Sequence, residues 1–213
     1  MPRITEERRA ARRAEIVGAA RRCFSRDGFH QTSMPDIAAE AGVSPGASYR
    51  YFAGKEEIVV EIAGQAFRAM FAPVEALLAE GRPLSVSDLV ASAVDAVGGE
   101  TVRDEAGHEV PVGELLRCGV QAWGELLRNE GLRQHAQDGF DQVRARMAVA
   151  LRGGQAAGTV PAGLDPDRGT RVVMALLHGF VLQRTAFGLT DTAGFVEDVR
   201  GFLGGPGPAR SAD

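Results

Sequence analysis

Residues 33 to 55, SMPDIAAEAGVSPGASYRYFAGK, constrain the fold of this 213-residue chain more than any other stretch. Ser33 is suited to cap a helix, and Asp36 three residues later completes a capping-box pattern. Gly42 is suited to end that helix, because glycine enters the left-handed conformation without a Cβ penalty and Val43 can then fold back. The first half of the stretch therefore predicts a short helix with a defined start and end.

A second short helix is expected directly afterwards. Ser44 is its predicted N-cap, and Pro45 stands in its first turn, where a missing N–H group costs no hydrogen bond. Two helices that meet at an angle across a three- or four-residue turn form a helix-turn-helix, here at about residues 33–52.

The second helix carries side chains that suit double-stranded DNA. The chain's only tyrosines, Tyr49 and Tyr51, flank Arg50, which is the best candidate for a direct base contact. Small or apolar residues that suit contacts with thymine methyl groups or base edges are Pro45, Gly46 and Ala47. Donors suited to phosphate oxygens are Ser33, Ser44, Tyr49, Tyr51 and the chain's single lysine, Lys55. The alternative is a packed helical hairpin with a solvated polar face.

The charge distribution supports the DNA hypothesis, although the formal net charge of −4 does not. Residues 1–55 carry 10 basic and 6 acidic side chains, whereas the remainder carries 14 and 22. A basic head on an acidic body orients a protein on DNA. Arginines also crowd the N-terminus, as Arg3, Arg8, Arg9, Arg12 and Arg13, and fit equally a solvated helix start or a basic arm that touches DNA.

The same stretch resembles the TetR family of bacterial transcriptional regulators. The matching segments are CFSRDGF, IAAEAGVS, PG, YRYF and GKEE, and the resemblance covers roughly residues 8–65. It implies an all-α homodimer with an N-terminal DNA-binding domain and a C-terminal ligand-binding and dimerisation domain. Ser48 departs from the pattern, because the family usually has a buried aliphatic residue there. Its hydroxyl needs a partner, and a carbonyl one turn earlier is available.

The remaining pattern predicts an all-α chain of about nine helices. The first helix ends at Gly28, and a long helix leaves Lys55 and is kinked or ended by Pro73. Further helices are expected from about residue 85 to 97, from 114 to 129, and after Gly131, followed by two apolar helices before residue 203. Residues 98–113 and 153–166 are expected to be loops.

The predicted domains are a DNA-binding domain at residues 1–55, a helical regulatory and dimerisation domain at 56–203, and a disordered tail at 204–213. The last two helices have apolar faces suited to packing against the same pair from a second copy, as a two-fold homodimer requires. The alternative is that both helices face their own core. A dimer would place two recognition helices in successive major grooves of a palindrome, about 34–36 Å apart.

By the resemblance, the C-terminal half is expected to hold a small-molecule effector, which is mostly apolar because the helices are. Apolar candidates for this pocket are Phe67, Met70, Phe71, Trp123, Met147 and Met174, each of which also fits a plain core position. His178 is a further candidate, which also fits a structural histidine in an apolar helix. Arg117 and Gln121 are candidate polar anchors.

Other classes of protein find no support in the sequence. We find no phosphate loop, nucleophile elbow or paired metal motif, so no enzyme activity, cofactor or metal is expected, and His108 lacks metal-ligand spacing. Cys23 and Cys118 are expected to be buried free thiols. The N-terminus lacks the apolar region of a signal peptide, and no run of about 18 apolar residues occurs, so a cytoplasmic protein without membrane contact is expected.

The predicted function is a ligand-responsive DNA-binding regulator. The simplest form is a repressor that binds a palindromic operator as a dimer and is released by its effector. The alternatives are an activator, and a helix-turn-helix protein that acts through a protein partner.

Overall fold

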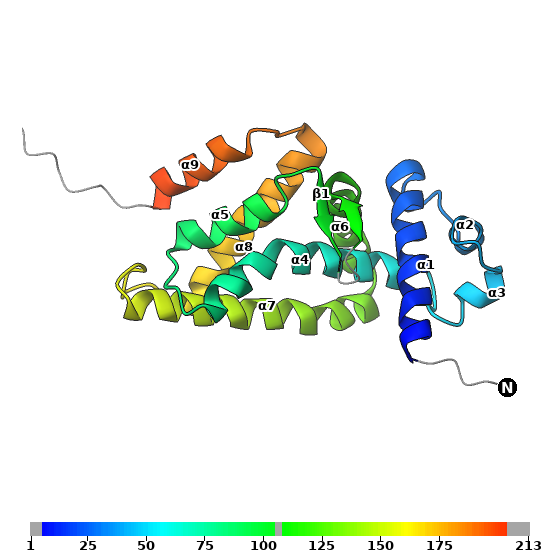
Figure 1. Cartoon of the computed structure of the whole chain (residues 1–213), viewed down its shortest axis with the longest axis horizontal. Coiled ribbons are helices and arrows are strands. Elements are labelled where there is room, and N and C mark those ends of the chain that lie inside the picture. The colour runs from blue at the N-terminus through cyan, green and yellow to red at the C-terminus, as the bar shows by residue number, and fades with distance from the viewer. Residues whose placement is uncertain (1–5, 105–107, 204–213) are drawn as a thin grey trace, which may run out of the picture. The chain divides into compact units, whose positions relative to one another are not determined.

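The computed structural model describes residues 6–104 and 108–203, and helices dominate that part of the chain (Figure 1). The predicted tail at 204–213 and Arg3 lie outside the described residues. The helices are α1 (Glu6–Asp27), α2 (Met34–Glu40), α3 (Pro45–Ser48), α4 (Lys55–Ala79), α5 (Val86–Ala96), α6 (Val112–Arg128), α7 (Glu130–Ala156), α8 (Pro166–Phe187) and α9 (Thr192–Leu203). The predicted all-α fold is confirmed.

The chain forms two compact units. The first unit comprises Met1–Phe67 and Arg103–Asp138, and the second comprises Arg68–Val102 and Gly139–Asp213. The boundaries fall inside α4 and α7, so each of these helices contributes residues to both units. The functional division between residues 55 and 56 stays a prediction.

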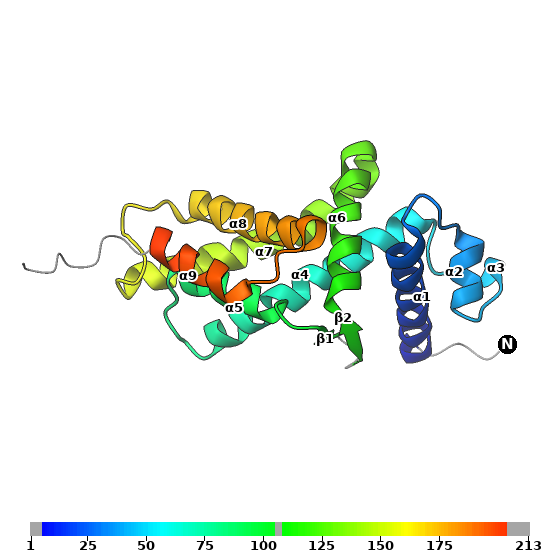
Figure 2. The same cartoon turned by 90° about the horizontal axis from the view of Figure 1, so that it is seen from above.

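In the first unit, α2 and α3 pack on one side of α1 (Figure 2). The core side of α1 buries Ile16, Ala20 and Phe24, which follow one another at helical spacing. Gly28 ends α1 at a φ of +85°, and Phe29 folds back until its ring centroid lies 5.2 Å from that of Phe24. Phe29 therefore forms a hydrophobic cap at the end of α1, which ends at Gly28 as predicted.

The predicted start and end of α2 are also confirmed. The Ser33 hydroxyl accepts a hydrogen bond from the Asp36 N–H, while the Asp36 carboxylate accepts one from the Ser33 N–H. Gly42 has a φ of +65°, and the Val43 N–H donates to the Ala38 carbonyl at 2.9 Å. That bond closes the Schellman arrangement at the end of α2.

Helix α6 also packs against α1 in the first unit. The Arg21 guanidinium lies 3.3 Å from the Glu114 carboxylate, and Arg117 donates two hydrogen bonds to the Ser25 hydroxyl, at 3.1 and 2.9 Å. Cys118 is buried in this interface, and both Cys23 and Cys118 are buried free thiols, as predicted.

The prediction of one long loop at residues 98–113 is wrong in part. Two short strands, β1 (Thr101–Arg103) and β2 (Glu109–Pro111), pair as a small hairpin. Val110 on β2 is 2 % exposed. Thr101, Val102 and Val110 are β-branched residues that suit a strand, a signal that the surrounding Gly and acidic residues obscured.

The second unit contains α5, α8 and α9, with α5 in contact with both of the others. Ser85 and Asp88 form a capping box that starts α5, and Asp165 caps α8 through the N–H groups of Asp167 and Arg168. Leu89, Phe180 and Val196 are buried residues of α5, α8 and α9. Among the described residues, no helix is both long and apolar enough to cross a lipid bilayer.

Packing decides two helix ends. Of the two outcomes expected at Pro73, a kink or an end, the end is excluded: helix α4 continues to Ala79, because the burial of Met70, Phe71 and Val74 outweighs one missing backbone hydrogen bond. Helix α7 continues through Gly153 and Gly154 to Ala156. The prediction of a loop from residue 153 onward is therefore wrong for the last turn of this helix.

Candidate nucleic-acid interface

The second helix of the helix-turn-helix is shorter than predicted. It runs only from Pro45 to Ser48, after which the Arg50 and Tyr51 N–H groups bond carbonyls three residues earlier. The Ser48 side chain is fully buried, and its hydroxyl donates to the Pro45 carbonyl at 2.8 Å. The expected back-bond of Ser48 is therefore present. It occupies a carbonyl at the start of this one-turn helix.

The outward surface of α3 and the following turn is accessible. Ser44, Pro45, Gly46 and Arg50 are exposed, and Tyr49 is 54 % exposed. No heavy atom lies within 4 Å of the position that a Cβ on Gly46 would take, so another backbone could approach closely. Ala47 and Tyr51 are half-buried at the margin of this surface.

Arg50 has no partner within the described part of the chain, whereas Arg13 and Lys55 are bonded inside the protein. Its guanidinium is exposed and stands one residue after Tyr49. A guanidinium in this state can form two parallel hydrogen bonds with a guanine edge or a phosphate.

The position of Lys55 argues against its predicted phosphate contact. Its Nζ donates to the carbonyls of Phe29 and Thr32, both at 2.8 Å, and to that of His30 at 3.3 Å. Nζ also lies 4.6 Å from the centroid of the Phe29 ring. These three bonds use every N–H of the ammonium group. Lys55 therefore fastens the α1–α2 loop to the start of α4.

Ser33 is also engaged within the protein. Its N–H and its hydroxyl both donate to Asp36 Oδ2, at 2.8 and 2.6 Å. These hydrogen bonds lower the pKa of Asp36 below its ordinary value. Ser44 starts α3 without a side-chain capping bond, so of the two predicted serine contacts Ser44 is the one with an available hydroxyl.

The N-terminal arginines divide into two groups. Arg13 donates to the Tyr51 carbonyl and to Glu61 at 3.0 Å each, and its guanidinium carbon lies 4.0 Å from the centroid of the Phe52 ring. Arg13 therefore ties α1 to the end of the helix-turn-helix. Arg8 and Arg9 are exposed on α1 and keep both interpretations open.

The predicted effector residues are distributed over the two units. The first unit holds Phe67, Arg117, Gln121 and Trp123, and the second holds Met70, Phe71, Met147, Met174 and His178. Arg117 binds Ser25 of α1 rather than an open space. Trp123 is 43 % exposed, whereas the three methionines are buried.

Two polar residues of the second unit, which the sequence pattern did not indicate, each have a buried atom without a partner in the described part of the chain. Arg144 Nε and Thr185 Oγ1 are buried, and no hydrogen-bond partner for either occurs among the described residues. Arg144 follows Phe140 by one turn and precedes Met147 by one, a helical spacing that could have revealed it. Phe140 of α7 also stacks on His178 of α8, with ring centroids 6.3 Å apart. Burial holds the pKa of His178 below its ordinary value.

Comparisons with known proteins match both the helix-turn-helix and the C-terminal helices to known families. The family described as "Bacterial regulatory proteins, tetR family" matches residues 16–62, and "BetI-type transcriptional repressor, C-terminal" matches residues 112–203. The uncharacterized HTH-type transcriptional regulator YfiR of Bacillus subtilis is 35% identical over 162 residues, which cover 72% of this chain and 70% of YfiR.

Solved structures share the fold. Salmonella enterica GusR superposes with a TM-score of 0.65 and 23% identity, covering 95% of this chain and 100% of GusR. Thermus thermophilus FadR, solved in complex with lauroyl-CoA, superposes with a TM-score of 0.62 and 21% identity, covering 94% of this chain and 98% of FadR. With its helix-turn-helix, its all-α fold and its matches at both ends, the chain belongs to the TetR family of bacterial transcriptional regulators.

Proposed function

We propose that this regulator is a repressor that binds a palindromic operator as a homodimer in the cytoplasm and is released by a small-molecule effector. The observation that carries the proposal is the accessible surface of α3, in which Arg50 has no partner among the described residues while Arg13 and Lys55 hold the scaffold behind it. A rigid support with a free guanidinium is what base recognition requires.

The homodimer is supported by a stripe on α8 that is exposed except at half-buried Gly179. Its members follow heptad-like spacing and are small or apolar: Val172, Ala175, Gly179, Leu182 and Ala186. A Cβ on Gly179 would meet no heavy atom within 4 Å, so a partner helix could approach closely there. Phe202 on α9 is 91 % exposed. Exposed apolar helix faces of this kind are typical of two-fold interfaces.

The effector is proposed to bind in the second unit against α7 and α8. Arg144 Nε is a buried donor without a partner, and Thr185 Oγ1 is a buried hydroxyl in the same state among the described residues. Buried polar groups are normally paired, so these two are suited to meet a ligand's acceptor. Lauroyl-CoA bound to FadR combines an apolar chain with polar acceptors, and we propose an amphiphile of that general kind for this chain.

Release from DNA follows from differential binding. An effector that prefers one arrangement of the dimer lowers the affinity for an operator that prefers another, and the coupling is reciprocal. Helix α4 begins at Lys55 beside the α1–α2 loop and ends at Ala79 in the second unit. It is the covalent route by which a change in the second unit reaches the helix-turn-helix.

The first experiment is retention of genomic DNA fragments by the immobilised full chain, followed by a salt titration on the best fragment. We expect a palindromic fragment whose binding falls steeply as salt rises. No selective retention at low salt, from protein stripped of bound small molecules, would favour the protein-partner hypothesis instead. A reporter placed behind the retained fragment then separates repressor from activator, because deletion of the gene raises expression only for a repressor.

A further inference from the structure

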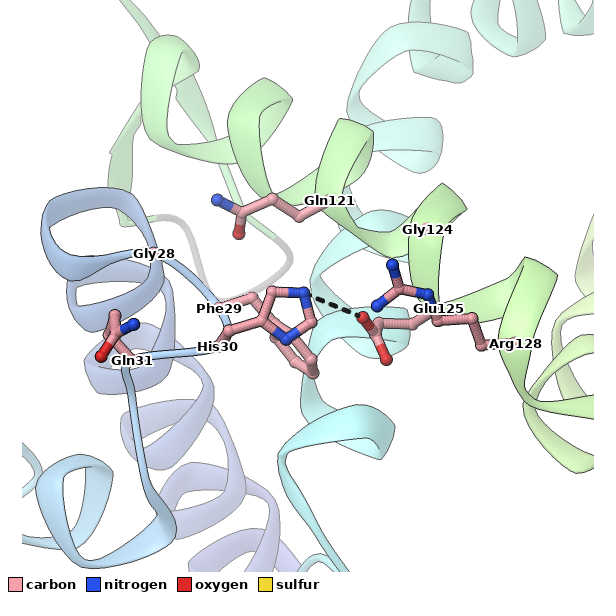
Figure 3. Close-up of a pocket in the computed structure, with 8 residues that line it drawn as sticks. All are labelled: Gly28, Phe29, His30, Gln31, Gln121, Gly124, Glu125 and Arg128. Carbon is pink, nitrogen blue, oxygen red and sulfur yellow. Dashed lines mark ion pairs between the residues drawn. The ribbon is translucent and has the colours of Figure 1, made fainter.

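The first unit contains a pocket between the loop after α1 and one face of α6 (Figure 3). Its volume is about 400 Å³, which lies within the range of small-molecule sites. The loop contributes Gly28, Phe29, His30 and Gln31, and α6 contributes Gln121, Gly124, Glu125 and Arg128. The exposed residues of α3 are not part of this pocket.

The walls of the pocket are held in place by contacts outside it. Lys55 fixes the loop through the carbonyls of Phe29 and His30, and Arg117 fixes α6 to α1 through Ser25. Gln121, Glu125 and Arg128 follow one another at helical spacing on α6, so they share one face of that helix. The pocket is therefore preorganised rather than assembled from loose side chains.

Two hydrogen-bond acceptors line this pocket with little protein to bind them. Gln121 Oε1 is buried and has no partner among the described residues, and the amide extends from α6 toward the loop (Figure 3). The Glu125 side chain is 12 % exposed, and its carboxylate lies 3.9 Å from His30 Nε2, an ion pair when the imidazole is protonated but beyond hydrogen-bond distance (Figure 3). A largely buried carboxylate and a buried amide oxygen gain most from a ligand that donates several hydrogen bonds, as a protonated amine does.

A third polar group on the same α6 face is positively charged. Arg128 is exposed and follows Glu125 by three residues. A guanidinium binds a carboxylate through two parallel N–H bonds. Phe29 adds an apolar ring to the wall beside His30. The set comprises two acceptors, one fork-shaped donor and an apolar surface.

We propose that this pocket binds a free amino acid with an apolar side chain. The ammonium group binds Glu125 and Gln121, the carboxylate binds Arg128, and the side chain packs toward Phe29. This site differs from the effector site proposed for the second unit, and the inference does not depend on DNA binding.

The test screens the twenty standard L-amino acids against the purified full chain, by thermal shift and then by isothermal titration calorimetry. We expect at least one apolar amino acid to bind with a dissociation constant of about 1 mM or tighter. The matching amine without the carboxylate, and the matching acid without the amine, each bind about tenfold more weakly. No binding by any amino acid at about 10 mM, well above the expected constant, overturns the proposal.

Variants locate the binding. Glu125→Gln and Gln121→Met are each expected to weaken it about tenfold, whereas Glu80→Gln, at an exposed glutamate after α4, leaves it unchanged. Gln121→Met removes an unpaired buried oxygen, so the melting temperature of the ligand-free protein stays the same or rises, which a purely structural glutamine would not allow. Arg128→Gln changes an exposed side chain and supplies the test if Gln121→Met fails to fold. Full binding in Glu125→Gln and Arg128→Gln places the ligand elsewhere and refutes the inference.

Discussion

Among single residues, the cations of the N-terminal bundle (α1–α3 with Lys55) differ in what already binds them. Lys55 and Arg13 are held by carbonyls, a carboxylate and aromatic rings, whereas Arg50 has no partner among the described residues. A charged group that the protein already binds loses those bonds when it turns to DNA. Sequence alone could not make this distinction, because Lys55 and Arg50 are both basic residues beside a helix-turn-helix.

Replacing Arg50 with Ala should weaken binding to the operator by about 1–3 kcal/mol and relax the preference at one base position. Replacing Lys55 with Ala should instead lower the free energy of unfolding by about 1–3 kcal/mol, because three carbonyls lose their donor. Fluorescence anisotropy at several salt concentrations, with chemical denaturation alongside, separates the two effects. An Lys55→Ala protein of unchanged stability and flatter salt slope would restore the phosphate role.

The pH dependence of stability should include a contribution from His178. Burial lowers its pKa in the folded state below the ordinary value of 6.5, so folding favours the neutral imidazole. Stability is therefore lost as pH falls below 6.5, because the unfolded state then binds a proton more readily than the folded state does. Denaturation between pH 8 and pH 5 should show a smaller loss of stability in His178→Gln than in the parent chain. Equal losses in both proteins would contradict the assignment.

At the scale of the elements, local capping signals predicted helix boundaries well. Ser33 starts α2 and Gly42 ends it where the pattern placed them, and α5 begins at about the expected residue, because caps depend on the few residues around them. The end of α7 was mispredicted, and of the two outcomes expected at Pro73 the end of α4 is excluded, because packing decided both. The hairpin at β1 and β2 was missed because each strand has only three residues. The DNA-contacting residues stay a prediction, and the hydrogen bonds that engage Ser33 and Lys55 could not be predicted because they depend on the folded loop.

Gly154 in α7 is expected to tolerate no side chain. A Cβ there would lie 2.4 Å from the Leu84 carbonyl oxygen and 2.6 Å from Val160 Cγ2. Gly154→Ala should therefore lower the free energy of unfolding by about 1–3 kcal/mol through overpacking. Its neighbour is a matched control: Gly153 faces open space, so Gly153→Ala should raise stability by up to about 1 kcal/mol through helix propensity. Thermal and chemical denaturation of both variants checks the pair, and equal behaviour would refute the packing argument.

For the whole molecule, the stripe on α8 is the surface through which we propose that two copies of the chain associate. Leu182→Arg should leave the fold intact, since Leu182 is 47 % exposed, but should place a charge in the proposed two-fold interface. Analytical ultracentrifugation should then show a monomer at concentrations where the parent chain is a dimer. Ala145→Arg, on an exposed part of α7, is the control and should remain dimeric. A dimeric Leu182→Arg protein would move the interface away from this stripe.

The hydrogen bonds of Lys55 have a consequence for chemical labelling. Because the chain has one lysine, its ε-amine is the sole side-chain primary amine for amine-selective acylating reagents. That amine is bonded to the carbonyls of Phe29, His30 and Thr32, so these bonds must break before the nitrogen can attack a reagent. The acylation rate of one atom then reports how often the joint between the α1–α2 loop and α4 opens, and mass spectrometry can follow it without any introduced probe.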